Sequence, residues 1–244
     1  MGPGSAFAAS SETLRGVLLL LGSLTVLAGE TAAFREADLK KVLAWSSAGQ
    51  MGVVLIGSAL PVDAAVGWTL FFLMSHALAK TLLLLLAGYF AARAGDSRWE
   101  AMRGLGRAHP LAAGLFAAGA LSLMGLPLFA GFWGKLGILR AAFASGVPGA
   151  LAAAAILVGA VAEGVYFLRI AHRLFESPEA APEGAGAAAA ETPAGAAPRR
   201  APASLLIPAL ILAAALLLLG LRPTLAIRVL APAAQELASP NEHY

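Results

Sequence analysis

Six long stretches of this 244-residue sequence are almost free of charge, and each is long enough to cross a lipid bilayer. A spanning helix needs about 20 apolar residues, because each residue rises ~1.5 Å across a hydrocarbon core of ~30 Å. The stretches are 14–34, 42–60, 64–92, 111–143, 149–174 and 203–221. Charged residues make up only 13% of the chain, against roughly 25% in soluble domains. The sequence therefore predicts an all-α integral membrane protein with about six transmembrane helices.

The fourth stretch is too long for one straight span, and its middle contains residues that interrupt a helix. Pro127 removes one helical hydrogen bond, and Gly125 and Gly131 loosen the backbone beside it. Irregular backbone survives at membrane depth only where protein or a wet cavity satisfies its polar groups. We therefore expect a discontinuous fourth helix, made of two half-helices joined by an irregular segment.

Lysine and arginine are concentrated in alternate connections, which predicts how the bundle is oriented. The basic connections contain Arg35, Lys40 and Lys41, then Arg93, Arg98, Arg103 and Arg107, then Arg173, Arg199 and Arg200. Because cytoplasmic loops carry the excess of basic residues, we expect these three in the cytoplasm and both termini outside.

The chain divides into three parts by composition. Residues 1–175 contain the first five predicted spans, and residues 203–244 contain the last span and an external tail. The segment 176–202 between them is rich in Ala, Gly, Pro and Glu and has no aromatic residue. It has too little apolar surface to offset the entropy of ordering, so we expect a disordered cytoplasmic linker.

Four titratable residues lie well inside the predicted spans, at His76, Lys80, Lys135 and Glu163. A charge at membrane depth costs at least ~2.5 kcal/mol, so such residues commonly serve ion or proton transfer. His76 and Lys80 are four apart and share a helix face, and Lys135 follows the break. Glu163 either pairs with one of these lysines or is protonated and inert. The alternative is that the lysines extend toward headgroups or bind backbone carbonyls; Glu30 we interpret as interfacial.

Several classes of function are disfavoured by the sequence. The absence of cysteine excludes disulfides and thiolate metal sites. A net charge of +3 with scattered basic residues does not indicate a nucleic-acid partner. The phosphate-binding, zinc-protease and serine-hydrolase motifs are missing, and we find no pattern for a redox cofactor.

Three sequence motifs, in the same order, resemble those of one membrane protein family. They are residues 38–47 (DLKKVLAWSS, followed by QMG at 50–52), residues 76–80 (HALAK) and the broken-helix pattern of residues 125–135 (GLPLFAGFWGK). This pattern resembles the antiporter-like, proton-translocating subunits L, M and N of NADH-quinone oxidoreductase (respiratory complex I), with relatives in membrane-bound hydrogenases and Mrp antiporters. The resemblance covers residues 14–174, with Lys41, Trp45 and Leu128 replacing the commoner Arg, Tyr and Pro.

The resemblance implies a fold and a set of roles. Family members have fourteen transmembrane helices in two inverted repeats, and this chain is similar to helices nine to fourteen. Lys135 would exchange protons with the external side, with His76 and Lys80 as the central relay and Glu163 as a further member. Asp38, Lys40, Ser46 and Ser47 would form the cytoplasmic loop motif.

The resemblance also implies what this chain works with. The missing N-terminal half and other membrane subunits would be its partners in the bilayer, and we expect a fragment or split-gene product of a longer subunit. NADH, quinone, flavin and iron–sulfur clusters would be bound by partner subunits, and no cofactor by this chain.

Three functions remain open on the sequence. The leading hypothesis is a non-redox, proton-translocating subunit of a complex I-like oxidoreductase, or a related hydrogenase, in the inner (cytoplasmic) membrane. The second is a subunit of an Mrp-type sodium/proton antiporter without redox chemistry, and the third is a purely structural membrane segment. The motifs are shared between the first two, so they do not decide the coupling ion.

Overall fold

The computed structural model describes residues 3–61, 63–177 and 201–225, together with residues 227, 228, 230 and 232. Within these residues the regular structure is helical, with one isolated backbone bridge between Asp38 and Arg98. In chain order the helices are α1 (Pro3–Arg35), α2 (Leu39–Ala59), α3 (Asp63–Ala94), η1 (Trp99–Met102), α4 (Leu105–Ala108), α5 (Pro110–Met124), α6 (Ala130–Ala144), α7 (Gly146–Phe175) and α8 (Ala203–Leu221). The predicted all-α class is confirmed.

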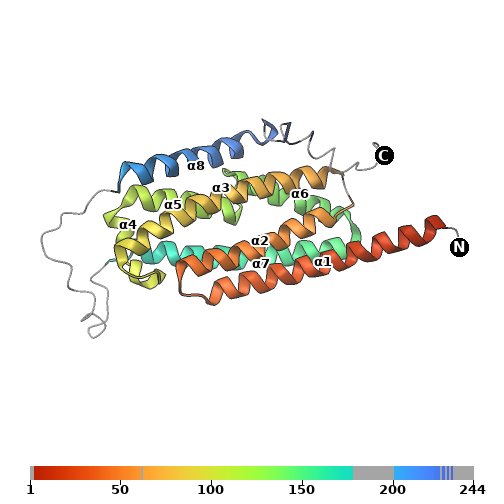
Figure 1. Cartoon of the computed structure of the whole chain (residues 1–244), viewed down its shortest axis with the longest axis horizontal. Helices are drawn as coiled ribbons and strands as arrows, with labels where there is room; N and C mark the ends of the chain where they lie inside the picture. Colours follow the sequence, from red (N-terminus) through yellow and green to blue (C-terminus); the bar gives the residue numbers. More distant parts are fainter. Residues whose placement is uncertain are drawn as a thin grey trace, which may run out of the picture.

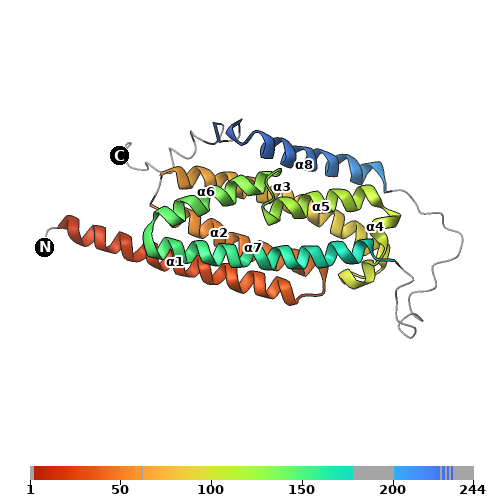
Figure 2. The ribbon, with the colours of Figure 1, turned by 180° about the vertical axis from the view of Figure 1, so that it is seen from behind.

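The long helices run side by side along one axis (Figures 1 and 2). Helices α1, α2 and α7 form one side of the bundle, and α3, α5, α6 and α8 form the other. Five helices are long and apolar enough to cross a membrane, namely Ser11–Arg35, Leu39–Ala59, Ala65–Ala94, Gly146–Phe175 and Ala203–Leu221. Helix α5 is a shorter apolar helix, and α6 follows it along the bundle, so the two together take the place of the predicted fourth span. The chain is therefore a multi-pass membrane protein.

The predicted break of the fourth span lies between α5 and α6. Gly125 ends α5 in the left-handed conformation (φ 84°), and its N–H bonds back to the carbonyls of Leu121 and Ser122. The N–H of Leu126 also reaches the Leu121 carbonyl, at 3.0 Å. Because the last turn of α5 closes on itself in this way, the break does not depend on water for these groups. The discontinuous helix is confirmed.

Gly131 allows the two half-helices to lie close together. Its N–H donates to the Ser122 hydroxyl at 3.4 Å, and a Cβ at position 131 would overlap the Ser122 carbonyl oxygen. A residue with any side chain would therefore push α6 away from α5.

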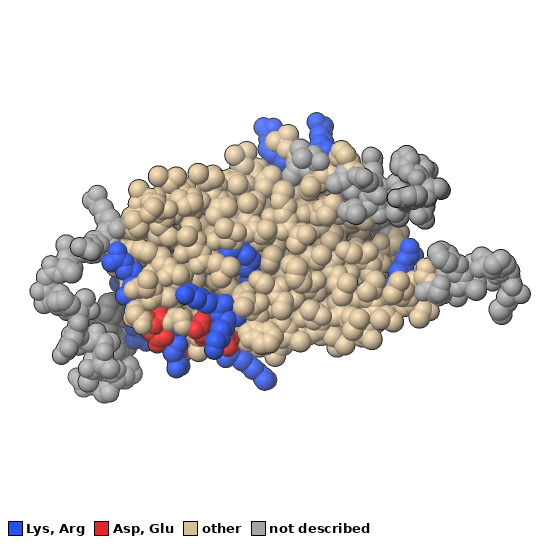
Figure 3. Space-filling view, in the orientation of Figure 1, with Lys and Arg blue, Asp and Glu red and all other residues tan. Residues whose placement is uncertain are grey.

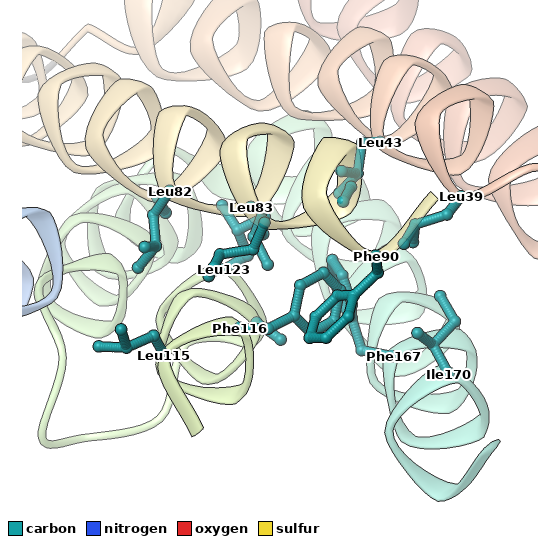
Figure 4. Close-up of a cluster of buried hydrophobic side chains, with 14 of the residues drawn as sticks. Leu39, Leu43, Leu82, Leu83, Phe90, Leu115, Phe116, Leu123, Phe167 and Ile170 are labelled. Carbon is teal, nitrogen blue, oxygen red and sulfur yellow. The ribbon is translucent and has the colours of Figure 1, made fainter. Parts of the chain in front are cut away.

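An apolar core fastens α3 between α2, α5 and α7 (Figure 4). Phe90, Phe116 and Phe167 are fully buried. The ring of Phe116 meets Phe90 and Phe167 edge to face, at centroid distances of 6.1 and 6.5 Å. Edge-to-face packing is a preferred geometry for aromatic pairs. This core fixes the relative heights of the helices that carry the buried charged residues.

The outer surface of the bundle is largely apolar, as lipid contact requires. Exposed apolar side chains include Leu20 and Leu24 on α1, Val161 and Leu168 on α7, and Ile211 on α8. Acidic residues visible in Figure 3 gather with basic ones at one end, whereas the middle of that face is almost free of them. A surface of this kind in a multi-helix chain is typical of a lipid-facing protein.

The charged end is held together by Asp38, which caps the first turn of α2. Its Oδ1 accepts hydrogen bonds from the N–H groups of Lys40 (2.9 Å) and Lys41 (3.1 Å), and its Oδ2 accepts one from the Ser97 hydroxyl. Partial burial by itself would raise the pKa of Asp38, but the bonds from Ser97, Lys41 and Lys40 outweigh it and lower the pKa. The motif aspartate therefore fastens α2 to the segment that follows α3.

The same end fixes the last turn of α7. The Glu176 carboxylate pairs with Arg173 at 2.7 Å and with Arg103 at 3.5 Å, and the hydrogen bond from Arg173 lowers its pKa. Arg107 donates to the Phe175 carbonyl at 2.6 Å. Residues 178–200 of the predicted linker lie outside the described residues, as does most of the predicted external tail beyond Leu225.

Candidate functional site

Lys135 lies in the second turn of α6, directly after the break, and its side chain is buried. Its ammonium donates to the Leu123 carbonyl at 2.5 Å and to Glu163 Oε2 at 2.6 Å. In a continuous helix the Leu123 carbonyl would accept from the N–H of residue 127, but Pro127 has none. The break therefore provides the acceptor that the lysine uses, and Lys135 does not extend to the headgroups.

Glu163 projects from the middle of α7 and is completely buried (0% exposed). Its Oε2 binds Lys135, and its Oε1 accepts a hydrogen bond from Gln50 Nε2 at 3.1 Å. Of the alternatives left open for Glu163, pairing with Lys135 is the one that the structure contains. A buried ion pair of this kind depends on such added hydrogen bonds, because each ion has lost its contact with water.

A second carboxylate, Glu30 of α1, lies across Gln50 from Glu163. The Gln50 amide nitrogen donates to Glu30 Oε1 at 2.9 Å, and the Tyr166 hydroxyl donates to Glu30 Oε2 at 3.0 Å. Glu30 is only 1% exposed. The interpretation of Glu30 as an interfacial residue is therefore wrong. Two glycines bring α1 and α2 close enough for this contact, since a Cβ at Gly29 or Gly49 would overlap the facing helix or the Glu30 side chain.

Lys80 of α3 lies against α2, next to the two serines of the predicted loop motif. Its ammonium donates to the Leu43 carbonyl and to Ser46 Oγ, each at 2.9 Å. Ser47 donates to the same Leu43 carbonyl at 2.9 Å. The Ser46 hydroxyl also lies near the Tyr166 hydroxyl of α7. Ser46 is therefore buried at the lysine and Ser47 is half-buried beside it, whereas Lys40 is exposed at the charged end of the bundle.

His76 lies one turn before Lys80 on the same helix and is also buried. Its Nδ1 has no hydrogen-bond partner among the described residues, and its ring lies 6.2 Å from that of Phe72. Its charge interacts with those of both Lys80 and Lys135. His76 thus lies within electrostatic range of both lysines, with one ring nitrogen free to accept a proton or a water molecule.

The arrangement brings two lysines and two carboxylates together in the interior of the bundle. The four groups are Lys80, Lys135, Glu30 and Glu163, and full ionisation leaves them without net charge. Buried charges persist when they are paired in this way. Amines, carboxyls, imidazole and hydroxyls can each take up and release a proton, so the cluster can store and transfer protons. In the described part of the chain, no group of three or more His, Cys, Asp or Glu side chains is placed to hold a metal ion.

The four predicted relay residues all belong to this cluster or lie next to it, but three further members were not predicted. Glu30, Gln50 and Tyr166 come from three different helices and meet only in the folded bundle. One signal was available for Tyr166, which is three residues after Glu163 and so shares its helix face. Gln50 belongs to the motif region, where it was noted without a role.

The chain is similar to known membrane proteins over most of its length. Residues 4–161 match the family described as NADH:quinone oxidoreductase/Mrp antiporter, transmembrane. NADH-quinone oxidoreductase subunit N 1 of Solidesulfovibrio magneticus is 37% identical over 67% of this chain and 35% of its own length. Subunit N of Desulforudis audaxviator is 32% identical over 86% of this chain and 42% of its own.

A solved structure from the Mrp branch is also similar to this chain. The Mrp complex from Dietzia sp. DQ12-45-1b contains a chain that superposes with a TM-score of 0.80 at 30% identity, over 93% of this chain and 48% of that one. The chain thus spans less than half the length of these relatives, which are named as subunits of multisubunit membrane complexes. With the family match covering well over half of the sequence, the chain belongs to the NADH:quinone oxidoreductase/Mrp antiporter transmembrane family.

Proposed function

We propose that this chain translocates protons as part of a non-redox membrane subunit of a complex I-like NADH-quinone oxidoreductase. The observation that carries the proposal is the buried Lys135–Glu163 ion pair, held at 2.6 Å beside a broken transmembrane helix. An ammonium at this depth is costly, so such residues usually serve ion or proton transfer. The relatives named as NADH-quinone oxidoreductase subunits support the redox branch of the family.

In this proposal Lys135 exchanges protons with the external side of the membrane. The Leu123 carbonyl and Glu163 hold the protonated amine. Weakening either contact, or adding positive charge nearby, favours loss of its proton. The neutral Lys135 amine then accepts a proton from the interior of the bundle, and Lys80 and His76 form the central relay that supplies this proton.

The setting of the chain is part of the same proposal. We place the chain in the inner (cytoplasmic) membrane. The alternation of basic connections supports an orientation in which the first turn of α2, η1 and α4 face the cytoplasm and both termini are external. The partners would be the N-terminal half of the same subunit and further membrane subunits. NADH, flavin, iron–sulfur clusters and quinone would act in those partners, and this chain would bind no cofactor.

A second function is favoured by one observation. The Dietzia structure that superposes with a TM-score of 0.80 is an Mrp complex. The chain would then belong to a sodium/proton antiporter without redox chemistry. The same buried cluster serves either function, and the two differ in what drives the protons.

Proton pumping by membrane vesicles that contain the intact complex tests the proposal. Lys135→Ala should stop pumping driven by NADH when vesicles are compared at equal amounts of assembled complex, which is needed because the change leaves Glu163 buried without its partner. Arg140→Ala is the matched control, because Arg140 is an exposed basic residue on the same helix and lies outside the cluster, and it should pump normally.

The outcomes separate the candidates. Normal NADH-driven pumping by the Lys135→Ala complex would refute the proposal. Vesicles that fail to respond to NADH, but exchange protons for sodium in a Lys135-dependent manner, would establish the antiporter instead. If Lys135→Ala does not assemble, Lys135→Gln keeps a hydrogen-bond donor toward Leu123 and repeats the test.

A further inference from the structure

We infer that Glu30 is an additional proton-carrying residue, which Lys80 supplies through the hydroxyls of Ser46 and Tyr166, and that Gln50 keeps its proton apart from the Lys135–Glu163 pair. The inference rests on the proposed function of proton translocation. It adds to that function a side branch on α1 and α7, away from the helices that carry the two lysines.

The branch is a series of neighbouring buried side chains. Lys80 donates to Ser46 Oγ at 2.9 Å, and the Ser46 hydroxyl lies beside the Tyr166 hydroxyl. Tyr166 in turn donates to Glu30 Oε2 at 3.0 Å. Each of these four residues is at most 6% exposed, so bulk water does not compete for the contacts. The series joins α3, α2, α7 and α1 in that order.

Lys80 donates to Ser46 and Tyr166 donates to Glu30, so one proton can move from Lys80 to Glu30 when the Ser46 hydroxyl turns to donate to the Tyr166 oxygen. The ammonium gives a proton to Ser46 Oγ, Ser46 gives its own to the Tyr166 oxygen, and Tyr166 gives its own to Glu30 Oε2. Lys80 ends as a neutral amine and Glu30 as a neutral carboxylic acid, with both hydroxyls restored. The step creates no new charge, which suits an interior where charged groups are poorly solvated.

Gln50 prevents the same proton from passing on to Glu163. Its amide nitrogen donates to Glu30 Oε1 and to Glu163 Oε1 at 2.9 and 3.1 Å, so it binds both carboxylates as a donor only. An amide does not exchange its protons readily as a hydroxyl or carboxyl does. Gln50 therefore holds the carboxylates in register but interrupts proton transfer between them.

Charge still acts across Gln50. Glu30 interacts electrostatically with both Glu163 and Lys135. When Glu30 has been protonated and Lys80 has taken up a further proton, the cluster carries one positive charge more than before. Repulsion by that charge favours release of the Lys135 proton. The branch would thus make proton loading on one side of Gln50 promote proton release on the other.

The test compares variants in the same NADH-driven vesicle assay, with Lys135→Ala as the reference for the proposed function. Glu30→Gln keeps the size and the acceptor for Tyr166 and should lower the protons pumped per NADH several-fold with assembly unchanged. Glu30→Asp, which keeps a titratable group, should restore part of the loss. Tyr166→Phe should act like Glu30→Gln, and Tyr89→Phe is its control because Tyr89 bonds His109 outside the cluster.

Two further readouts separate proton transfer from structural support. Infrared difference spectra of the working complex should contain a protonated-carboxyl band that shifts in D₂O and is absent in Glu30→Gln. Gln50→Glu places a carboxyl between Glu30 and Glu163. This variant should lower the number of protons pumped per NADH, because protons can then pass from Glu30 to Glu163 and back.

The results distinguish this inference from the proposed function. Normal pumping by Glu30→Gln together with loss of pumping in Lys135→Ala would overturn the inference and leave the function intact. Normal pumping by both Glu30→Gln and Lys135→Ala would overturn the inference and the proposed function together. Equal loss of pumping in Glu30→Gln and Glu30→Asp, with the infrared band retained, would show that Glu30 only supports the bundle and would also overturn the inference.

Discussion

The ammonium of Lys135 binds the carbonyl oxygen of Leu123, a group whose helical donor is missing because the residue four positions further on is Pro127. The helix break therefore provides the hydrogen-bond acceptor that the buried lysine needs. Pro127 leaves the Leu123 carbonyl without its helical donor at membrane depth, and the Lys135 ammonium donates to that carbonyl instead. Glu163 from α7 then neutralises the charge.

Replacing Pro127 with Ala should weaken proton pumping more than it weakens folding. Alanine supplies the missing N–H and removes a helix-breaking residue that costs ~3 kcal/mol inside a helix. The restored helical bond would compete with Lys135 for the Leu123 carbonyl. Vesicle pumping per NADH measures the effect, and Pro110→Ala is the control, since Pro110 is at the start of α5 where proline is tolerated. Equal behaviour of the two variants would contradict the role of Pro127.

Replacing Glu163 with Gln should destabilise the chain and stop pumping, because it leaves the Lys135 ammonium buried without its counter-charge. Breaking one side of a buried ion pair costs roughly 3–5 kcal/mol. The double variant Lys135→Gln with Glu163→Gln should recover much of the lost stability without recovering pumping. Thermal unfolding of the detergent-solubilised complex provides the comparison as a double-mutant cycle. Additive effects of the two changes would show that the residues do not interact.

Replacing Ser46 with Ala should affect pumping more than replacing Ser47, although the two serines are neighbours. Ser46 accepts from the Lys80 ammonium, whereas Ser47 donates to a carbonyl in its own helix. A hydrogen bond to a charged group contributes about 1.5–3 kcal/mol, against about 1 kcal/mol for a neutral one. Pumping rates of the two alanine variants at equal complex content give the answer. A larger loss of pumping in Ser47→Ala than in Ser46→Ala would contradict the role of the Lys80–Ser46 hydrogen bond.

The sequence was sufficient for the features that depend on local composition. Hydropathy and length predict the five long spanning helices, and the glycines and proline of residues 125–131 predict the break, because both are properties of one segment. The pairing of Lys135 with Glu163 remained open, since periodicity places a residue on a helix face but does not say which helix it meets.

Glu30 was misinterpreted for a related reason. Five residues before the basic Arg35, it has the position of an interfacial residue when its own helix is considered alone. Its burial arises from the close approach of α1 and α2 at Gly29 and Gly49, which brings Gln50 to its carboxylate. Contacts between side chains of three helices cannot be derived from the periodicity of any one of them.

Replacing Gly131 with Ala should destabilise the bundle, whereas Gly114→Ala should leave it unchanged or slightly stabilise it. A Cβ at position 131 would overlap the Ser122 carbonyl, while one at position 114 would meet nothing within 4 Å. In an unhindered helix the glycine-to-alanine change is favourable by about 0.5–1 kcal/mol. The difference in melting temperature between the two variants of the solubilised complex measures the close approach of α5 and α6. Similar melting temperatures would contradict it.

The charged end should respond to acid through Asp38. The pKa of Asp38 is lowered from its usual value of 3.8 in the folded chain. A carboxylate with a lowered folded pKa adds stability that is present above its unfolded pKa and is lost as pH falls through the folded one. The contribution should therefore be complete at neutral pH and decline as the pH approaches 3.8 and falls below it.

Asp38→Asn retains an N-cap of similar quality but loses the charge that Ser97 and the backbone N–H groups bind. The variant should melt at a lower temperature than the parent at pH 7, and the two should converge as the pH falls below 3.8. A melting difference that stays constant from pH 7 to strong acid would mean that the Asp38 charge does not contribute to holding α2 against the segment after α3.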